Sequence, residues 1–160
     1  MTRAPIFAAV LLALAACSPS GSGSGTAPTV QAAGAICRPT PVGRQMTGCY
    51  LTLTAAADDR LTAVESPAAN LVQIHESRME GGMMMMRELR DGLALPAGQA
   101  VALEPGGNHL MLLGVKEPLV AGDTVALTLT FASSAPVEVT ATVGQPAAPG
   151  ADADAAPGAH

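Results

Sequence analysis

The chain has 160 residues, of which 49% are hydrophobic and 13% are charged, and its formal charge is −5. This length fits one domain with extensions at its ends, and the apolar content is sufficient for a buried core. Because Lys and Arg form no basic cluster, the composition argues against nucleic acid as a partner.

The N-terminal segment is typical of an exported lipoprotein. Arg3 provides a positive start, and the apolar run over 4–14 is shorter than the roughly 20 residues that a membrane-spanning helix needs. The sequence Leu-Ala-Ala-Cys, which ends at Cys17, looks like a bacterial lipobox. We therefore expect a signal peptide over 1–16 and a lipid on Cys17 that anchors the protein to a membrane outside the cytoplasm. The alternative is an ordinary signal peptide, with no lipid on Cys17.

Two low-complexity segments flank the predicted domain. Residues 17–28 are rich in Gly and Ser, which is typical of a flexible tether. Residues 145–160 are rich in Pro, Ala and Gly, and we expect them to be disordered. The folded domain is therefore predicted to span 29–144.

The domain itself is predicted to be all-β. Short apolar runs, most of them alternating with polar residues, recur between turn signals, and no segment has the apolar stripe of a helix. Many short strands at this spacing are typical of a β-sandwich or barrel. The predicted strands cover 49–55, 70–77, 83–89, 99–105, 109–115, 123–132 and 137–143.

Two cysteines, Cys37 and Cys49, lie within the predicted domain. An exported protein folds in an oxidising compartment, where two such cysteines can form a disulfide. The alternative is a pair of small buried thiols. Their spacing is not that of a Cys-x-x-Cys pair, which argues against a thioredoxin-like redox role.

The stretch from His75 to Met86 concentrates one histidine and five methionines around a Gly-Gly turn. This turn signal predicts a hairpin whose strands bring His75 and Met86 to the same end of a sheet. In a later strand, period-2 geometry puts His109 and Met111 on one face and turns Leu110 toward the core. The four His and Met side chains are therefore predicted to converge away from the main apolar face.

The donor types in this cluster favour a soft metal ion. Thioether sulfur is a soft, neutral donor and imidazole is a borderline one, so together they suit Cu(I). Zinc is more often held by Cys, His and carboxylate, and Ca²⁺ or Mg²⁺ by oxygen ligands. Taken singly, the residues also have ordinary interpretations, namely a surface histidine and a methionine-rich strand at a core or an edge.

The sequence from His75 onward resembles the periplasmic copper chaperones of the PCuAC family. Their signature is a His, a Met about eleven residues later, and a His-x-Met a little over twenty residues further on, which here correspond to His75, Met86, and His109 with Met111. The phrases GCYLTLT, PGGNHLML and GDTVALTLTF fit as well, and the resemblance covers residues 35–143.

The resemblance implies a cupredoxin-like β-sandwich that binds Cu(I) through these four side chains at an exposed edge. It also implies delivery of copper to copper-accepting proteins such as cytochrome c oxidase subunits or Sco-type proteins. We expect such a protein to be a monomer in the periplasm and not an enzyme.

Some residues depart from the family pattern. A disulfide between Cys37 and Cys49 would be an extra staple, and Ser77 stands where relatives often carry Met. The tail offers His160 as its only histidine, so a second copper site there is doubtful. By alternation Met84 shares a face with Met86 and is a candidate auxiliary ligand, although packing is the favoured role. Met46, in the turn between the first two strands, is expected at the surface or in packing. The roles of Met79, Met83 and Met85 stay open.

The main alternative is a lipid-anchored β-sandwich that binds a protein or a small ligand through its methionine hairpin, with no metal role. An enzyme has little support. No Ser-His-Asp grouping with a recognisable nucleophile elbow is present. A blue-copper redox site would need a Cys ligand, and neither domain cysteine lies near the His and Met positions in sequence.

Overall fold

The computed structural model describes residues 29–146, in which ten β-strands form and no helix does. None of these residues belongs to a helix that could cross a membrane. The predicted signal peptide, the tether, Cys17 and the chain from 147 onward, with His160, lie outside the described residues. The strands are β1 (Val30–Cys37), β2 (Met46–Ala55), β3 (Asp59–Glu65), β4 (Ala69–Glu80), β5 (Met83–Glu88), β6 (Leu93–Leu95), β7 (Ala100–Leu103), β8 (Asn108–Val115), β9 (Thr124–Phe131) and β10 (Val137–Val143).

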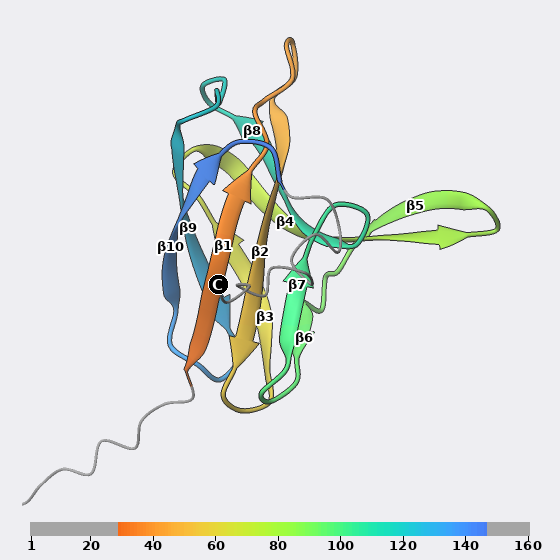
Figure 1. The fold of residues 1–160 in the computed structure, drawn as a ribbon, viewed down its shortest axis with the longest axis vertical. Coiled ribbons are helices and arrows are strands. Elements are labelled where there is room, and N and C mark those ends of the chain that lie inside the picture. Colours follow the sequence, from red (N-terminus) through yellow and green to blue (C-terminus); the bar gives the residue numbers. More distant parts are fainter. Residues whose placement is uncertain (1–28, 147–160) are drawn as a thin grey trace, which may run out of the picture.

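The strands form one continuous hydrogen-bonded sheet that folds over into a sandwich (Figure 1). Their order is β5-β4-β8-β2-β1-β10-β9-β3-β6, and β7 pairs with β2 off this path. The pairing of β1 is antiparallel with β2 and parallel with β10, so the first strand joins the two layers. The predicted all-β sandwich is therefore confirmed.

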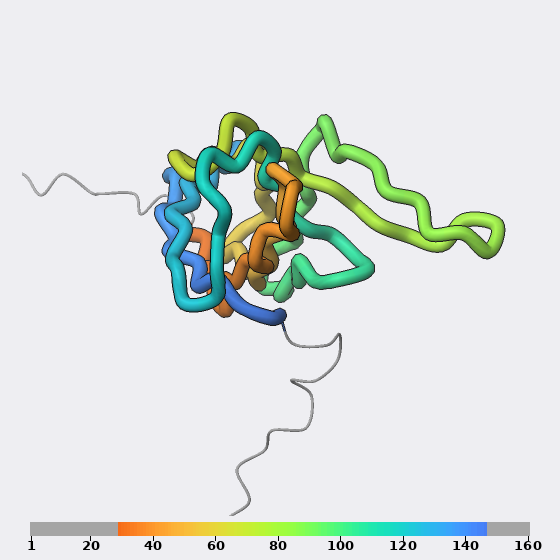
Figure 2. Tube along the Cα trace, turned by 90° about the horizontal axis from the view of Figure 1, so that it is seen from above, coloured from red at the N-terminus to blue at the C-terminus, as the bar shows by residue number. Residues whose placement is uncertain are grey.

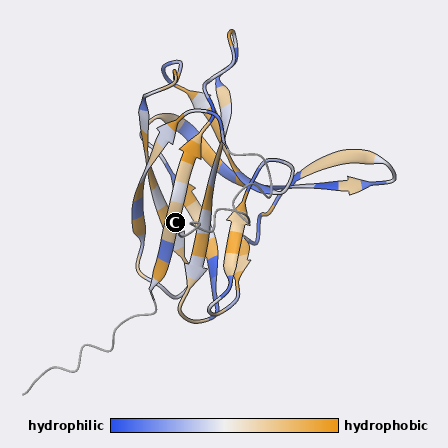
Figure 3. Cartoon of the chain, viewed as in Figure 1, coloured by the Kyte–Doolittle hydropathy of each residue, from blue (hydrophilic) through white to orange (hydrophobic). Residues whose placement is uncertain are grey.

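The core lies between the two layers and follows the period-2 pattern where the pattern is clearest. Leu110 and Leu112 of β8 are fully buried, as the sequence predicts, and so are Leu127 and Leu129 of β9. Thr128, which lies between the last two, points the other way and is only half-buried. In Figure 3 the apolar residues run along the strands of the body.

Cys37 and Cys49 are bridged by a disulfide between β1 and β2, with an S–S distance of 1.95 Å. The two cysteines are directly opposed in the register and fully buried. The bridge therefore ties the strand that joins the layers to the strand that pairs with β8.

The hairpin predicted around the Gly-Gly turn is present, and its two strands pair regularly. Strands β4 and β5 pair over six positions, from His75 opposite Glu88 to Glu80 opposite Met83. The turn consists of Gly81 and Gly82, with φ of 59° and 84°. Positive φ at both central residues is the geometry of a tight type I′ turn, which glycine adopts without strain.

The outer half of this hairpin leaves the body of the protein. The pairing of β4 with β8 ends at Glu76 opposite Asn108, and the N–H of Ser77 then donates to the carbonyl of Gly107 at 3.0 Å. Beyond Ser77, strand β4 pairs only with β5. Figures 1 and 2 both show β5 and the end of β4 as a two-stranded arm that extends away from the sandwich.

Candidate metal centre

The two candidate histidines face each other across neighbouring strands. His75 of β4 is directly opposite His109 of β8 in the register. Their ring centroids lie 5.6 Å apart, and the rings meet edge to face at 80°. His109 is 5% exposed, so it is a buried residue and not the surface histidine that the ordinary interpretation assumes.

The candidate thioethers lie on the same face of the sheet. Met111 is two residues beyond His109 on β8, and Met86 of β5 is directly opposite Ser77, which is two residues beyond His75 on β4. Since side chains two apart on a strand share a face, all four candidates face the same side. The structure therefore agrees with the side predicted for them.

An open pocket of about 340 Å³ brings three of these candidates together. Met86, His109 and Met111 line it, while His75 lies behind His109 and is not part of the lining. Ser77, which stands where relatives often carry Met, also lines the pocket and is 8% exposed. Its small side chain leaves space beside Met86.

The hydrogen bond of His109 determines which ring nitrogen can bind a metal ion. Its Nδ1 lies 3.0 Å from the carbonyl oxygen of Gly107. A carbonyl can only accept, so in the neutral ring Nδ1 carries the hydrogen and Nε2 keeps a free lone pair. A backbone partner of this kind is what commonly orients a metal-binding histidine.

His75 also has an uncommitted ring nitrogen. Its Nε2 lies 3.1 Å from the side-chain oxygen of Gln73, whereas its Nδ1 is buried and has no hydrogen-bond partner. Desolvation by burial and the nearby charge of His109 lower the pKa of His75, and Glu88 opposes the effect. The ring is therefore neutral near pH 7, and a buried nitrogen without a partner fits a metal ligand.

Residues that the sequence interpretation did not select form the rest of the pocket. Met46, at the start of β2, lines the pocket with Met86 and Met111, so it is a third thioether there. Tyr50 lies 6.5 Å from His109 between ring centroids, and the guanidinium of Arg38 stands 5.6 Å from the centre of the Tyr50 ring. Of these three residues, only Tyr50 belongs to a phrase that carries the family resemblance, GCYLTLT.

Gly48 lets Tyr50 reach this position. A Cβ at Gly48 would lie 2.9 Å from the Tyr50 hydroxyl oxygen, which is closer than real Cβ contacts. Gly48 is also directly opposite Met111 in the register. The glycine therefore allows the tyrosine ring to fold toward the histidine and methionine face.

The donor set points to a soft ion. Within residues 29–146 no three His, Cys, Asp or Glu side chains gather closely enough to hold a metal ion. The donors that gather here are the imidazole of His109, with His75 against it, and thioethers, a set that suits Cu(I) better than zinc or calcium.

The packing role favoured for Met84 is wrong, because the methionines of the arm are exposed. Met79, Met83, Met84 and Met85 are 47–67% exposed, and all four lie on the two-stranded arm. They fill no part of the core because no third strand lies beside the outer half of β4. Met46 is 43% exposed, as the surface alternative expects, and it is the first residue of β2 and not part of the preceding turn.

Comparisons with known proteins agree with the family resemblance. The chain matches, over residues 30–143, a family described as "Putative lipoprotein LpqE-like". A relative from Leifsonia xyli subsp. xyli (strain CTCB07), named "Putative lipoprotein Lxx21020", is 35% identical over 146 residues, which are 87% of this chain and 88% of the relative.

Solved structures of copper proteins share the fold. Apo-DR1885 from Deinococcus radiodurans is 28% identical with a TM-score of 0.55, over 91% of this chain and 96% of that one. Its Cu(I)-bound form matches at 28% identity and a TM-score of 0.52, over 78% and 82%. The copper-bound PCuAC domain from PmoF2 matches with a TM-score of 0.61 over 75% and 96%, and its 24% identity supports the fold alone. The predicted resemblance and the cupredoxin-like fold are thus confirmed.

Proposed function

We propose that this chain, which belongs to the LpqE-like family of lipoproteins and resembles PCuAC copper-chaperone domains, is a Cu(I) metallochaperone that works outside the cytoplasm. In this proposal His75, Met86, His109 and Met111 hold the ion. Copper is its cargo, and the protein is a carrier and not an enzyme.

One observation carries the proposal. His75 and His109 are in contact, each has an uncommitted ring nitrogen, and the thioethers of Met86 and Met111 lie at the pocket beside them. All four donors are uncharged, and such donors favour Cu(I) less strongly than thiolates would. The Cu(I)-bound form of DR1885, at 28% identity, supports the choice of ion.

The pocket is also suited to releasing its cargo. It is open to solvent, and Met86 comes from the exposed arm. A partner can therefore approach the ion from the side of Met86 and replace the thioethers one at a time. We propose copper-accepting proteins such as cytochrome c oxidase subunits or Sco-type proteins as recipients, on the strength of the family resemblance.

Anaerobic titration against a chromophoric Cu(I) chelator tests the site. We expect the protein to take up one Cu(I), and a variant with His75, Met86, His109 and Met111 all changed to Ala to lose at least about a hundredfold in affinity, since altering even the surroundings of a metal site costs ten- to a hundredfold. The matched control changes Met83 and Met85, on the opposite face of the arm, to Ala. A quadruple variant that competes as well as the control would refute this site.

We further propose that Cys17 carries a lipid that anchors the protein to a membrane, with the family description and the Leifsonia relative in support. Incorporation of labelled palmitate into the wild type and its loss on Cys17→Ser is the expected result. Label that persists in the variant would contradict the anchor.

A second function is favoured by the methionines of the arm, because exposed apolar patches often mark binding surfaces. In this alternative the protein is a β-sandwich that binds a protein or a small ligand through the arm. It predicts binding that does not depend on copper, so the titration above separates the two.

A further inference from the structure

The arm carries more thioethers than the proposed copper site uses. Of its five methionines, only Met86 belongs to that site, and all five are 47% or more exposed. Methionine on so exposed a surface contributes little packing. The five methionines lie on a projecting hairpin (Figure 2), so packing does not explain why they are there.

The register of the hairpin places these methionines on its two opposite faces. Met79 of β4 is directly opposite Met84 of β5, and Met86 lies two residues beyond Met84 on the same face. This face continues to the pocket, because Ser77 opposite Met86 is two residues from His75. Three thioethers thus lead from the tip of the arm to the pocket.

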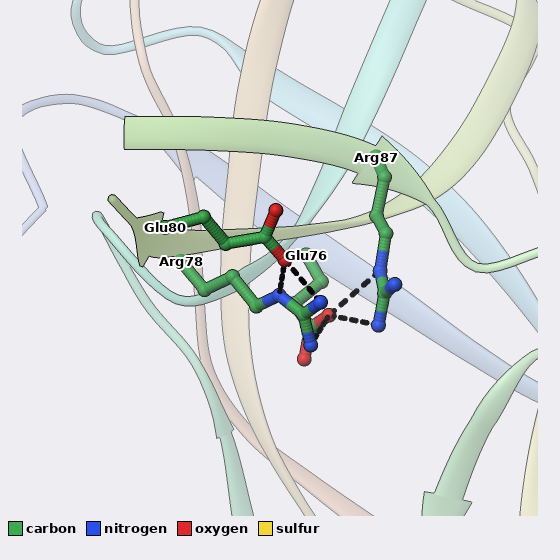
Figure 4. A network of polar contacts seen from close by, with 4 residues as sticks. All are labelled: Glu76, Arg78, Glu80 and Arg87. Carbon is green, nitrogen blue, oxygen red and sulfur yellow. Dashed lines mark hydrogen bonds and ion pairs between the residues drawn. The ribbon is translucent and has the colours of Figure 1, made fainter. Parts of the chain in front are cut away.

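The opposite face of the arm has a different chemistry. Met83 and Met85 lie there together with Glu76, Arg78, Glu80 and Arg87, by the alternation of the two strands. Figure 4 shows these four charged side chains joined in one network of ion pairs, in which Arg78 contacts both glutamates and Arg87 contacts Glu76 at 3.0 Å. The positive charges are thus neutralised within the arm, on the face away from the three thioethers.

The spacing of Met79, Met84 and Met86 allows them to hold one ion. Directly opposed residues in an antiparallel pair have Cβ atoms about 4.5–5.5 Å apart, and residues two apart on a strand are separated by roughly 7 Å. Methionine has three rotatable side-chain bonds, so three sulfurs placed in this way can turn toward a common point. Three neutral thioethers form a soft donor set for Cu(I) or Ag(I).

We propose that Met79, Met84 and Met86 form an outer Cu(I) site that receives the ion at the arm and passes it to the pocket, an inference that rests on the proposed function. Transfer is a ligand exchange. The bonds from copper to the sulfurs of Met79 and Met84 break as bonds to Met111 and to ring nitrogens of His109 and His75 form, while Met86 stays bound. No electron or proton moves, and copper remains Cu(I).

The test compares two double variants of the full chain, Met79→Leu with Met84→Leu and Met83→Leu with Met85→Leu. Leucine has nearly the volume and polarity of methionine, so both variants keep the shape of the arm and differ only in the face that loses sulfur. Each is also made in a background with His75→Ala, His109→Ala and Met111→Leu, which removes the inner ligands but keeps Met86.

In that background, Ag(I) should shift the methyl signals of Met79, Met84 and Met86 in spectra of ¹³C-methyl-methionine protein. We expect the shift of the Met86 signal, which both variants keep, to disappear with Met79→Leu and Met84→Leu and to remain in the Met83 and Met85 variant. With the inner ligands present, loading of Cu(I) from a chelator should slow by at least about tenfold in the first variant only, the lower end of what altered surroundings cost a metal site.

Two outcomes would overturn the inference, and they differ in what they say of the proposed function. If the wild type binds Cu(I) but the two double variants bind Ag(I) and load copper alike, the outer site is wrong and the inner site stands. If the wild type binds no Cu(I), the proposed function fails and the outer site fails with it.

Discussion

His109 donates its Nδ1 hydrogen to the Gly107 carbonyl over 3.0 Å, and this single bond leaves Nε2 free at the pocket. His75 also has a ring nitrogen without a hydrogen bond, because its buried Nδ1 has no partner. Burial and the neighbouring His109 lower the pKa of His75. Each ring therefore keeps one nitrogen that no hydrogen bond occupies and that is available to a metal ion.

Met46 gives a prediction at the scale of one residue. Because its thioether lines the pocket with Met86 and Met111, we expect Met46→Leu to weaken Cu(I) binding roughly tenfold, as other changes around metal sites do. The chelator titration measures it, with Met83→Leu on the far face of the arm as the control. Equal affinities in the two variants would mean that Met46 is only part of the pocket wall.

The sequence identifies the four ligand candidates but cannot identify Met46 or Tyr50 as their neighbours. His109 and Met111 share a face by alternation alone, which a sequence reveals. Met46 and Tyr50 reach the pocket because β2 pairs with β8 in an antiparallel register that places Gly48 opposite Met111. That register is decided by the packing of the whole sheet, and no local pattern contains it.

At the scale of the strand, three strands are not predicted from the sequence, namely β1, β3 and β6. In the first two the alternation is interrupted. Strand β1 has a register shift between Ala33 and Ile36, and β3 has one between Leu61 and Ala63, where the extra residue breaks the period of two. Strand β6 has three residues and is too short to show a period. The strands that the sequence does predict alternate or follow a strong turn signal; they are β2, β4, β5, β7, β8, β9 and β10.

Asp59, at the start of β3, gives a prediction at the same scale. It accepts backbone hydrogen bonds from Arg60, Ser133 and Ser134 at 2.7–2.9 Å, which hold β3 to the turn between β9 and β10. Desolvation by burial would raise the pKa of Asp59, but the hydrogen bonds from Ser134, Arg60 and Ser133 outweigh it and lower the pKa. A lowered pKa in the folded state means that the ionised form stabilises the fold.

We therefore expect Asp59→Asn to lower the free energy of unfolding by about 1 kcal/mol at pH 7. The contribution is complete above the unfolded-state pKa of about 3.9 and is lost as the pH falls through the lower pKa of the folded state. Urea unfolding at pH 7 and pH 3 measures the difference, and the same change at the exposed Asp91 is the control. A difference that grows in acid would contradict this account.

At the scale of the whole molecule, β1 pairs with both β2 and β10 and also carries one end of the disulfide. The bridge spans a sequence separation of 12 residues, so the loop-entropy argument predicts a stabilisation of about 3 kcal/mol. We expect reduction, or Cys37→Ala with Cys49→Ala, to lower the free energy of unfolding by that amount. Denaturant unfolding with and without dithiothreitol tests this, and coincident curves would show that the bridge adds no stability.

The direction of β1 also determines where the chain enters the domain relative to the pocket. The strand begins at Val30 and ends at Cys37, and the residues that follow it, Arg38 and Pro39, line the pocket. Eight residues at roughly 3.3 Å each separate the entry of the chain from the pocket by about 25 Å. The chain therefore enters the domain at the end of β1 away from the pocket, so the point of entry does not obstruct the mouth of the pocket.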